Sequence, residues 1–351
     1  MQQIAPEAVD SVEVTILADN FFDGLLLSEG PARRPILGPH HLNVTTPFME
    51  GGLAFDQPVV QHGFGALVVV ERDGHEHRVL FDTGATPDGL AENMRRMDLS
   101  FGDIEAIVLS HGHSDHTTGM DGLARALGRT NLPVLIHPEF WNRRRLAFPG
   151  REPFELPTTS REALEGAGFE IVEEERPSFL LDGSVLVTGE VDRSTPFERG
   201  MPGQQAFKGG EWVPDPLILD DQALLVNVRD RGLVILTGCG HSGIVNVVRH
   251  AREITGIGEV YAVIGGFHLG GPAFEPTIPE TVESLAAFDP GVLVPTHCTG
   301  YKAIHALAAR LPDAFHQSSV LTTFALYARN PKTTQALHRR SITNARHSTG
   351  G

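Results

Sequence analysis

A short histidine-rich segment constrains the fold of this chain more than any other feature. Residues 110–119 read SHGHSDHTTG and follow the apolar run of residues 106–109, so the segment begins where a buried strand should end. In extended chain the first two histidines and the aspartate lie on one side, and a turn into a helix brings the third histidine towards them. Imidazoles suit zinc, iron and related ions, and a carboxylate adds negative charge that helps to hold a second cation. The predicted metal ligands are His111, His113, Asp115 and His116.

A plainer interpretation of this segment is an exposed loop that happens to be rich in histidine. Buried histidines usually occur singly, each with one hydrogen-bonding partner. Four ligand-type side chains within six positions are hard to explain by packing, which favours a metal site at a strand-to-helix junction.

The segment matches the His-x-His-x-Asp-His signature of the metallo-β-lactamase superfamily, and three further motifs resemble one branch of it. Residues 237–246 read TGCGHSGIVN, residues 264–269 read IGGFHL and residues 295–300 read PTHCTG. This branch is the dihydropterin synthase-like group. The resemblance covers residues 12–326 and implies an α/β fold, an αββα sandwich in which two facing mixed sheets carry helices on their outer sides.

The rest of the chain agrees with one compact α/β unit, because short apolar strands alternate with amphipathic helices through both halves. A single domain is expected over residues 1–328, with loop-like insertions at about 30–52, 140–160 and 193–216. The arginines at 143–145 in the second insertion are explained either by a phosphorylated substrate or by a solvated loop. A basic tail, predicted to be disordered, covers residues 329–351.

Charge and composition limit the partners of the chain. Of its 351 residues, 28 are Lys or Arg and 44 are Asp or Glu, which gives a net charge of −16 at pH 7. Such an acidic chain argues against nucleic acid and anionic membranes as partners. The sequence shows no apolar stretch of membrane-spanning length and no signal-peptide pattern at its start. A cytoplasmic protein that acts on a small anionic molecule is expected, and the oligomeric state stays open.

A second group of residues must complete the metal site, because a catalytic zinc usually has three protein ligands and a water. His297 ends a short apolar strand and matches the last histidine of the superfamily. Where the superfamily has an aspartate that bridges two metals, this chain has Cys239 and His241. Either a Cys239 thiolate or the His241 imidazole is expected as a ligand, or both only shape the pocket. One or two zinc ions are predicted, with manganese or iron as alternatives.

The chain has two cysteines, Cys239 and Cys298, and both lie inside histidine-containing motifs. Their positions do not indicate a disulfide framework, so both are predicted to be reduced. Because Cys298 follows His297 at a strand end, strand alternation predicts that its thiol points away from the site and into the core.

Five more residues are assigned roles near the metal. Asp82, in the sequence LFDTG, resembles the superfamily aspartate that braces the ligand loop. Glu190 stands where other branches carry a histidine, and is predicted as an oxygen ligand or a substrate-binding carboxylate. Arg193 is a candidate contact for an anionic substrate, and His62 is a candidate pocket residue. His268 follows two glycines, and its alternatives are metal binding, proton transfer, substrate contact or a structural role.

The expected reaction is a metal-dependent transformation of a small anionic substrate. A bound metal can lower the pKa of water from about 15.7 to about 7, and Asp115 could steer the proton. The resemblance implies a phosphorylated or pterin-like substrate and a transferase. The alternatives are a zinc hydrolase of a lactone, ester or phosphodiester, an iron-dependent oxidoreductase, and a binding protein without activity.

Overall fold

Two facing β-sheets form the centre of the molecule. The computed structural model describes residues 3–36, 38–128 and 131–329, so nearly all of the predicted tail lies outside the described residues. In spatial order the first sheet contains β12 (Glu170–Glu173), β9 (Pro133–Ile136), β8 (Ala106–Val108), β7 (His75–Phe81), β6 (Gly65–Arg72), β2 (Ser11–Ala18), β21 (Thr323–Tyr327) and β3 (Ala32–Arg33). The second contains β13 (Ser178–Leu180), β14 (Val185–Val187), β17 (Ala223–Val228), β18 (Gly232–Thr237), β19 (Val260–Gly266) and β20 (Val292–Thr296), with β1 (Ala8–Val9) beside β17.

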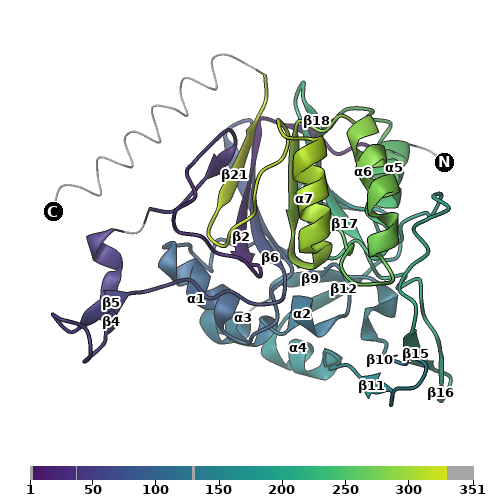
Figure 1. Cartoon of the computed structure of the whole chain (residues 1–351), viewed down its shortest axis with the longest axis horizontal. Coiled ribbons are helices and arrows are strands. Elements are labelled where there is room, and N and C mark those ends of the chain that lie inside the picture. The colour runs from purple at the N-terminus through teal and green to yellow at the C-terminus, as the bar shows by residue number, and fades with distance from the viewer. Residues whose placement is uncertain (1–2, 37, 129–130, 330–351) are drawn as a thin grey trace.

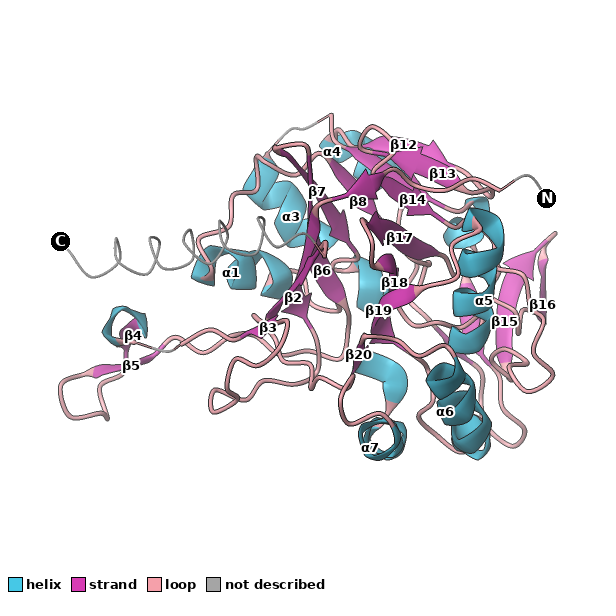
Figure 2. Ribbon diagram, turned by 90° about the horizontal axis from the view of Figure 1, so that it is seen from above, coloured by secondary structure: helices cyan, strands magenta, loops and turns pink. Residues whose placement is uncertain are grey.

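Helices cover the outer face of each sheet, and three apolar layers result. Alternate side chains of both sheets, such as Val68 and Val234, pack against each other in the middle layer. The outer layers lie under the helices (Figure 2). The first sheet is covered by α1 (Gly89–Arg96), α3 (Met120–Leu127) and α4 (Arg161–Ala167), and the second by α5 (Ile244–Thr255), α6 (Ile278–Ala287) and α7 (Tyr301–Arg310). The predicted αββα sandwich is confirmed.

Local sequence explains how the strands are joined. β6 and β7 form a hairpin whose turn residues, Asp73 and Gly74, have φ of 52° and 82°. Positive φ at both positions matches the right-handed twist of paired strands, and Asp-Gly tolerates it. The predicted hairpin is therefore present, and it delivers Asp82 directly after β7. Short elements complete the fold: α2 (Ser114–Thr117), η2 (Pro138–Trp141), η3 (Glu275–Thr277) and η4 (His297–Thr299).

Two of the predicted loop insertions are not loops throughout. They contribute strands to a separate accessory sheet of order β11-β10-β15-β16, seen at the lower right of Figure 1. The hairpin of β15 and β16 turns at Gly209 and Gly210, whose positive φ suits glycine. The strands are β10 (Arg144–Leu146), β11 (Phe154–Glu155), β15 (Gln204–Lys208) and β16 (Glu211–Pro214).

The first insertion forms an arm, residues 39–56, which stands away from both sheets (Figures 1 and 2). It consists of η1 (Pro39–His41), β4 (Leu42–Thr45) and β5 (Leu53–Phe55). The base of the arm is fixed to α1 because the Asp56 carboxylate pairs with the Arg96 guanidinium at 2.8 Å. Within the described ranges, no helix is both long and apolar enough to cross a membrane.

Candidate metal centre

The ligand loop lies where the carboxyl ends of strands from both sheets meet. In the first sheet the parallel pair of β7 and β8 ends beside it, and in the second sheet β18, β19 and β20 end with the three remaining motifs. Ligand sites in α/β proteins form at this edge, because the loops that follow parallel strands converge there. Motifs more than a hundred residues apart thus share one site.

The first ligand set consists of His111, His113 and His241. Their donor atoms all lie within 4.8 Å of one another, and all three side chains are buried. The Nε2 atom of His111 is 3.1 Å from the Nδ1 atom of His113. The ring of His241 approaches these two rings to 4.8 and 4.9 Å between centroids.

The second ligand set consists of Asp115, His116 and His297, together with Cys239. These donor atoms also lie within 4.8 Å of one another. One carboxylate oxygen of Asp115 is 3.2 Å from His297 Nε2 and 3.5 Å from His116 Nε2. The sulfur of Cys239 is 3.1 Å from His116 Nε2. The structure therefore brings together all seven residues that the sequence predicted as ligands, in two adjacent sets.

His268 lies beside both sets. Its nitrogen forms a further group with the donor atoms of Cys239 and His241, within the same 4.8 Å. Its ring packs 4.3 Å from the ring of His241 and 4.6 Å from that of Phe274. Its φ of 44° is rare for a non-glycine residue, so the backbone holds this side chain in place at a conformational cost. Burial lowers the pKa of His268, but the Cys298 sulfur outweighs burial and raises it overall.

Asp82, predicted to brace the ligand loop, contacts Ser110 and His116 within that loop. One of its carboxylate oxygens accepts the Ser110 backbone N–H at 2.7 Å. The other accepts the Ser110 hydroxyl at 2.7 Å and lies 2.7 Å from His116 Nδ1. The Ser110 oxygen also lies 2.9 Å from His111 Nδ1. A carboxylate can only accept, so these contacts place protons on both Nδ1 atoms and turn both Nε2 atoms towards the sets.

The unpartnered atoms of the site fit a metal ion. Neither ring nitrogen of His241 has a hydrogen-bond partner among the described residues, and nor does His297 Nδ1, although all three atoms are buried. A buried polar atom without a partner is costly, and native proteins usually satisfy it. Imidazoles, a carboxylate and a thiol are together the donors that zinc accepts, so the residues present fit this group of metals.

Charge differs between the two sets. Burial lowers the pKa of His113 to about 4 and holds those of His111 and His241 well below their usual value. Burial also disfavours a charged His116, but the carboxylates of Asp115 and Asp82 outweigh it and raise the pKa of His116 to about 9. The Asp115 pKa is lowered, despite burial, by His116 and His297.

Asp19 holds His297 in place, and sequence reasoning did not find it. Its buried carboxylate accepts the His297 backbone N–H at 3.0 Å and the Ser318 hydroxyl at 2.6 Å. The Asn20 amide donates to the His297 carbonyl at 2.9 Å. His297 has a φ of 46°, a strained conformation that these contacts maintain.

The accessory sheet also reaches the ligand loop through residues that sequence reasoning did not assign. The buried Arg144 guanidinium pairs with Asp220 and Asp215, and Asp220 accepts the Gly112 backbone N–H at 2.8 Å. Arg144 is therefore neither solvated nor free to meet a phosphate. Gln204, on β15, is 2 % exposed and contacts His113. The Gly-Gly turn at 209–210 was the one local signal for this sheet.

Three other predicted residues lie outside the two sets. Glu190 is exposed, and its backbone N–H donates to the Glu175 carbonyl. Arg193 donates to the carbonyls of His241 and Leu217, so its guanidinium links loops of the protein. The exposed ring of His62 lies 4.8 Å from that of His297.

The prediction that Cys298 points into the core is wrong. Its side chain is partly exposed, its thiol donates to the Cys239 carbonyl at 3.5 Å, and its sulfur faces His268 closely enough to influence its pKa. The reason is that β20 ends at Thr296 and the chain turns into η4, so side chains no longer alternate between two faces. Both cysteines are free thiols, as predicted.

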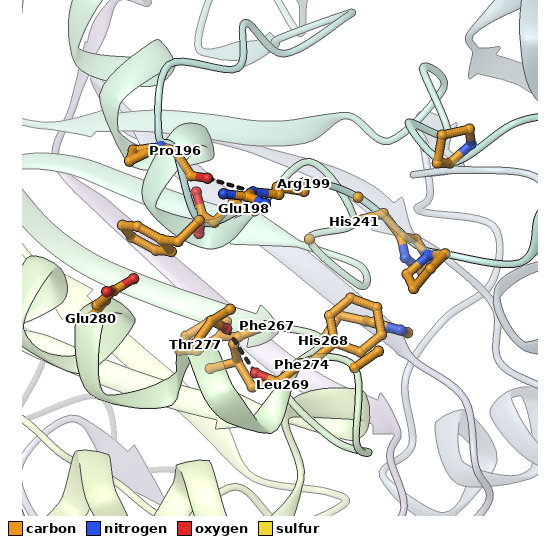
Figure 3. A pocket seen from close by; sticks show the side chains of 17 residues that line it. Pro196, Glu198, Arg199, His241, Phe267, His268, Leu269, Phe274, Thr277 and Glu280 are labelled. Atoms are coloured by element: carbon orange, nitrogen blue, oxygen red, sulfur yellow. Dashed lines mark hydrogen bonds between the residues drawn. The ribbon is translucent and has the colours of Figure 1, made fainter.

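A cavity of about 600 Å³ opens beside His241 and His268. Pro196, Glu198 and Arg199 line one side, and the segment from Phe267 to Thr277 lines the other (Figure 3). Three aromatic rings, those of Phe197, Phe267 and Phe274, give it apolar walls. Glu198 accepts the backbone N–H groups of Val245 and Asn246 at 2.8 Å, and thereby occupies the N-terminus of α5.

Comparisons with known proteins agree with this geometry. A sequence model described as the β-lactamase superfamily domain matches residues 77–172. The 7,8-dihydropterin-6-methyl-4-(β-D-ribofuranosyl)-aminobenzene-5'-phosphate synthase of Methanocaldococcus jannaschii is 32% identical over 264 residues, which cover 73% of this chain and 87% of the synthase. An uncharacterized protein of the same archaeon is 33% identical over 258 residues, covering 73% and 90%. The crystal structure of Tm1679, a metal-dependent hydrolase of the β-lactamase superfamily, has a TM-score of 0.65 at 21% identity, covering 89% of this chain and 98% of that one.

Proposed function

The chain belongs to the metallo-β-lactamase superfamily, in the group that includes the dihydropterin-related synthase, and we propose that it is a two-metal enzyme acting on a small anionic substrate. One observation carries this proposal. The donor atoms of two ligand sets converge at adjacent positions, and His241 of the first set also lines the cavity together with His268. The substrate class we favour is phosphorylated or pterin-like, in keeping with the name of the related synthase.

In this proposal each set holds one metal ion, most suitably zinc. His111, His113 and His241 hold the first ion, and Asp115, His116 and His297 hold the second with the Cys239 sulfur beside it. The ions would supply a Lewis acid for an acceptor or leaving-group oxygen and would acidify water. Manganese and iron are the alternatives that metal analysis must distinguish.

The remaining residues are proposed to bind the substrate and move protons. His268 borders the cavity and both sets, which places its ring to exchange a proton with a substrate bound there. The aromatic walls suit a planar or apolar part of the substrate. Because Glu198 already occupies the N-terminus of α5, the anionic part of the substrate is expected at the metals and not at this helix.

Three predicted residues outside the two ligand sets, His62, Arg193 and Glu190, are proposed to act at the edges of the site. His62 lines the rim of the second set through its contact with His297. Arg193 positions the loop that carries Glu198, since it donates to two carbonyls beside the cavity. Glu190, exposed and apart from the donor atoms, is proposed as a contact for an extended substrate and not as a metal ligand.

Hydrolysis of a lactone, ester or phosphodiester is the second candidate function. The observation that favours it is the adjacency of two ligand sets, since paired metals stabilise the attacking and leaving oxygens of a hydrolytic displacement. A hydrolase needs water alone as co-substrate, whereas a transferase needs a second organic substrate. Product analysis with one substrate and then with two separates them.

The experiment that tests the proposal begins with metal analysis of protein purified without added metal. About two equivalents of zinc, one of which is lost on His113→Ala together with turnover of phosphorylated, pterin-like or ester substrates, would support it. Stoichiometric iron with redox activity would instead indicate an oxidoreductase. Bound ligand without turnover in the metal-loaded protein would indicate a binding protein, and failure to bind zinc at all would exclude the proposal.

A further inference from the structure

One side chain of the accessory sheet contacts the first ligand set directly. Gln204, on β15, places its amide nitrogen 2.9 Å from His113 Nε2, the ring nitrogen that faces away from His111. Its amide oxygen is buried and has no hydrogen-bond partner among the described residues. A buried polar atom without a partner is rare in native proteins, so this amide oxygen needs an explanation.

The contacts of Gln204 begin a chain of hydrogen bonds that runs in one direction. The amide donates to His113 Nε2, so the His113 proton is on Nδ1, which donates to His111 Nε2 at 3.1 Å. His111 Nδ1 then donates to the Ser110 hydroxyl, which donates to Asp82. Each group along this chain donates to the next and accepts from the one before. This is the protonation pattern expected without a metal.

A metal at the first set requires a different pattern. The ion needs the lone pair of His113 Nδ1, because this atom faces the set while Nε2 faces Gln204. The proton must then move to Nε2, where it needs an acceptor. Rotation of the Gln204 amide by half a turn would bring the unused oxygen to that position.

We propose that Gln204 is a positioning residue that sets the tautomer of His113, and that its amide rotates when metal enters the first ligand set. The proposal rests on the proposed metal site. Glutamine suits this task because one amide offers a donor and an acceptor without a change of charge. The pairing of β15 with β10 fixes its position, since Arg144 on β10 is tied through Asp220 to the ligand loop.

Three variants of the full-length chain test this role. Gln204→Met keeps the length but offers neither donor nor acceptor, and Gln204→Glu only accepts. Gln205→Met is the control, because the neighbouring Gln205 bonds Arg145 and not a ligand. We expect zinc affinity at the first set, measured by chelator competition, to fall roughly 10- to 100-fold in Gln204→Met. It should stay at or above wild type in Gln204→Glu and be unchanged in the control.

The tautomer of His113 provides a readout that loss of packing would not change. Nitrogen NMR of the imidazole should show the proton on Nδ1 in metal-free wild type and on Nε2 in the zinc form. Equal zinc affinity in wild type and Gln204→Met, or a proton on His113 Nδ1 in the zinc form, would overturn the proposal. A wild-type protein whose first set binds no zinc would overturn the proposed function and this inference together.

The arm carries an independent inference about assembly. Its two strands pair with each other and with no further strand in the described part of the chain, and a lone hairpin is marginally stable in water. Phe48 at its tip is 94% exposed. Its other exposed large apolar residues are Leu42, Val44, Met49, Leu53 and Phe55.

We infer that the arm binds the arm region of a second copy of this chain. Leu25, Leu27 and Ile36, in the segment that precedes the arm, are also exposed. At roughly 150–200 Å² for a fully exposed large side chain, these residues and the arm offer on the order of 1,000 Å² of apolar surface. A stable interface buries about 800 Å² per partner. Copies with a net charge of −16 repel each other, and the arm is a region of low charge, with Glu50 and Asp56 as its charged residues.

Sedimentation velocity of the full-length protein at micromolar concentrations tests this inference. We expect a dimer for the wild type and a monomer for Phe48→Asp, which puts a charge at the arm tip. Phe179→Asp, on β13, is the control at another exposed phenylalanine and should stay dimeric. A monomeric wild type, or a Phe48→Asp variant that remains dimeric, would overturn it.

Discussion

The two ligand sets lie side by side, but they differ in charge. The first set is made of buried imidazoles whose pKa values are lowered, mainly by burial. The second contains a carboxylate, Asp115, whose side chain is 30% exposed, and an imidazole, His116, whose pKa is raised to about 9. At neutral pH without metal, the first set is neutral and the second is an ion pair.

This difference shows what each set requires of an incoming cation. The imidazoles of the first set are uncharged at neutral pH, so metal binding there needs a tautomer change at His113 but no net proton release. In the second set the carboxylates of Asp115 and Asp82 favour the protonated form of His116, and a metal must displace the proton on its Nε2 atom. We therefore expect the first set to fill before the second at neutral pH.

Removal of one ligand from each set should have the largest effect. His241→Ala should lose the ion of the first set and His297→Ala that of the second, with turnover falling more than about 100-fold in both. Metal counting on the purified variants provides the measurement, and His75→Ala, at an exposed hairpin position, provides the control. If His241→Ala removes the ions of both sets, the two sets form one cooperative site, and the view that they bind metal independently is wrong.

The pH dependence of metal affinity should differ between the sets by up to about 100-fold. Below about pH 9 a proton competes at His116, so zinc affinity of the second set should rise by up to tenfold per pH unit from pH 6.5 to pH 8.5. The first set should change little over this range, because the pKa of His113 is about 4. Chelator competition across this pH range measures both, and parallel slopes would contradict the assignment of charge.

Asp82→Asn should affect the second set more than the first. The amide can no longer accept from both Ser110 and His116 with the same oxygens, so the Nδ1 proton of His116 loses its acceptor or its charge partner. Zinc affinity of the second set is expected to fall roughly 10- to 100-fold. The first set is connected to Asp82 only through Ser110, so its zinc affinity should fall less. Equal losses at both sets would show that Asp82 braces the whole loop rather than one histidine.

Short motifs, together with the superfamily that they resemble, were sufficient to predict the fold and the residues that converge on the candidate site. The ligand loop is one contiguous motif, and strand ends before His241 and His297 placed those residues at the same edge of the sandwich. Asp82 was predictable because a hairpin delivers it there. In each case a short motif and a strand end carry the information, which needs no knowledge of tertiary contacts.

The residues that hold the ligands were not predictable in this way. Gln204, Asp220 and Asp19 come from segments without a recognisable motif, and only the folded chain brings them to the site. Cys298 was misplaced because strand alternation was extended past the end of β20. Segments with positive φ and short turns break the two-residue period on which that argument depends.

Of these variants, Asp19→Asn should change zinc affinity least, and it should do so at the second set only. The buried Asp19 carboxylate, whose pKa is raised by burial, fixes the backbone of His297 and contacts no residue of the first set. Asparagine keeps one oxygen for the His297 N–H, while the Ser318 hydroxyl can turn from donor to acceptor. We expect zinc affinity of the second set to fall severalfold, about 1 kcal/mol, with the first set unchanged. Asp19→Ala should lower the zinc affinity of the second set further, because the backbone N–H of the strained His297 then loses its acceptor. Chelator competition on both variants measures zinc affinity at each set. A lower affinity at the first set would mean that Asp19 also holds the residues of that set in place.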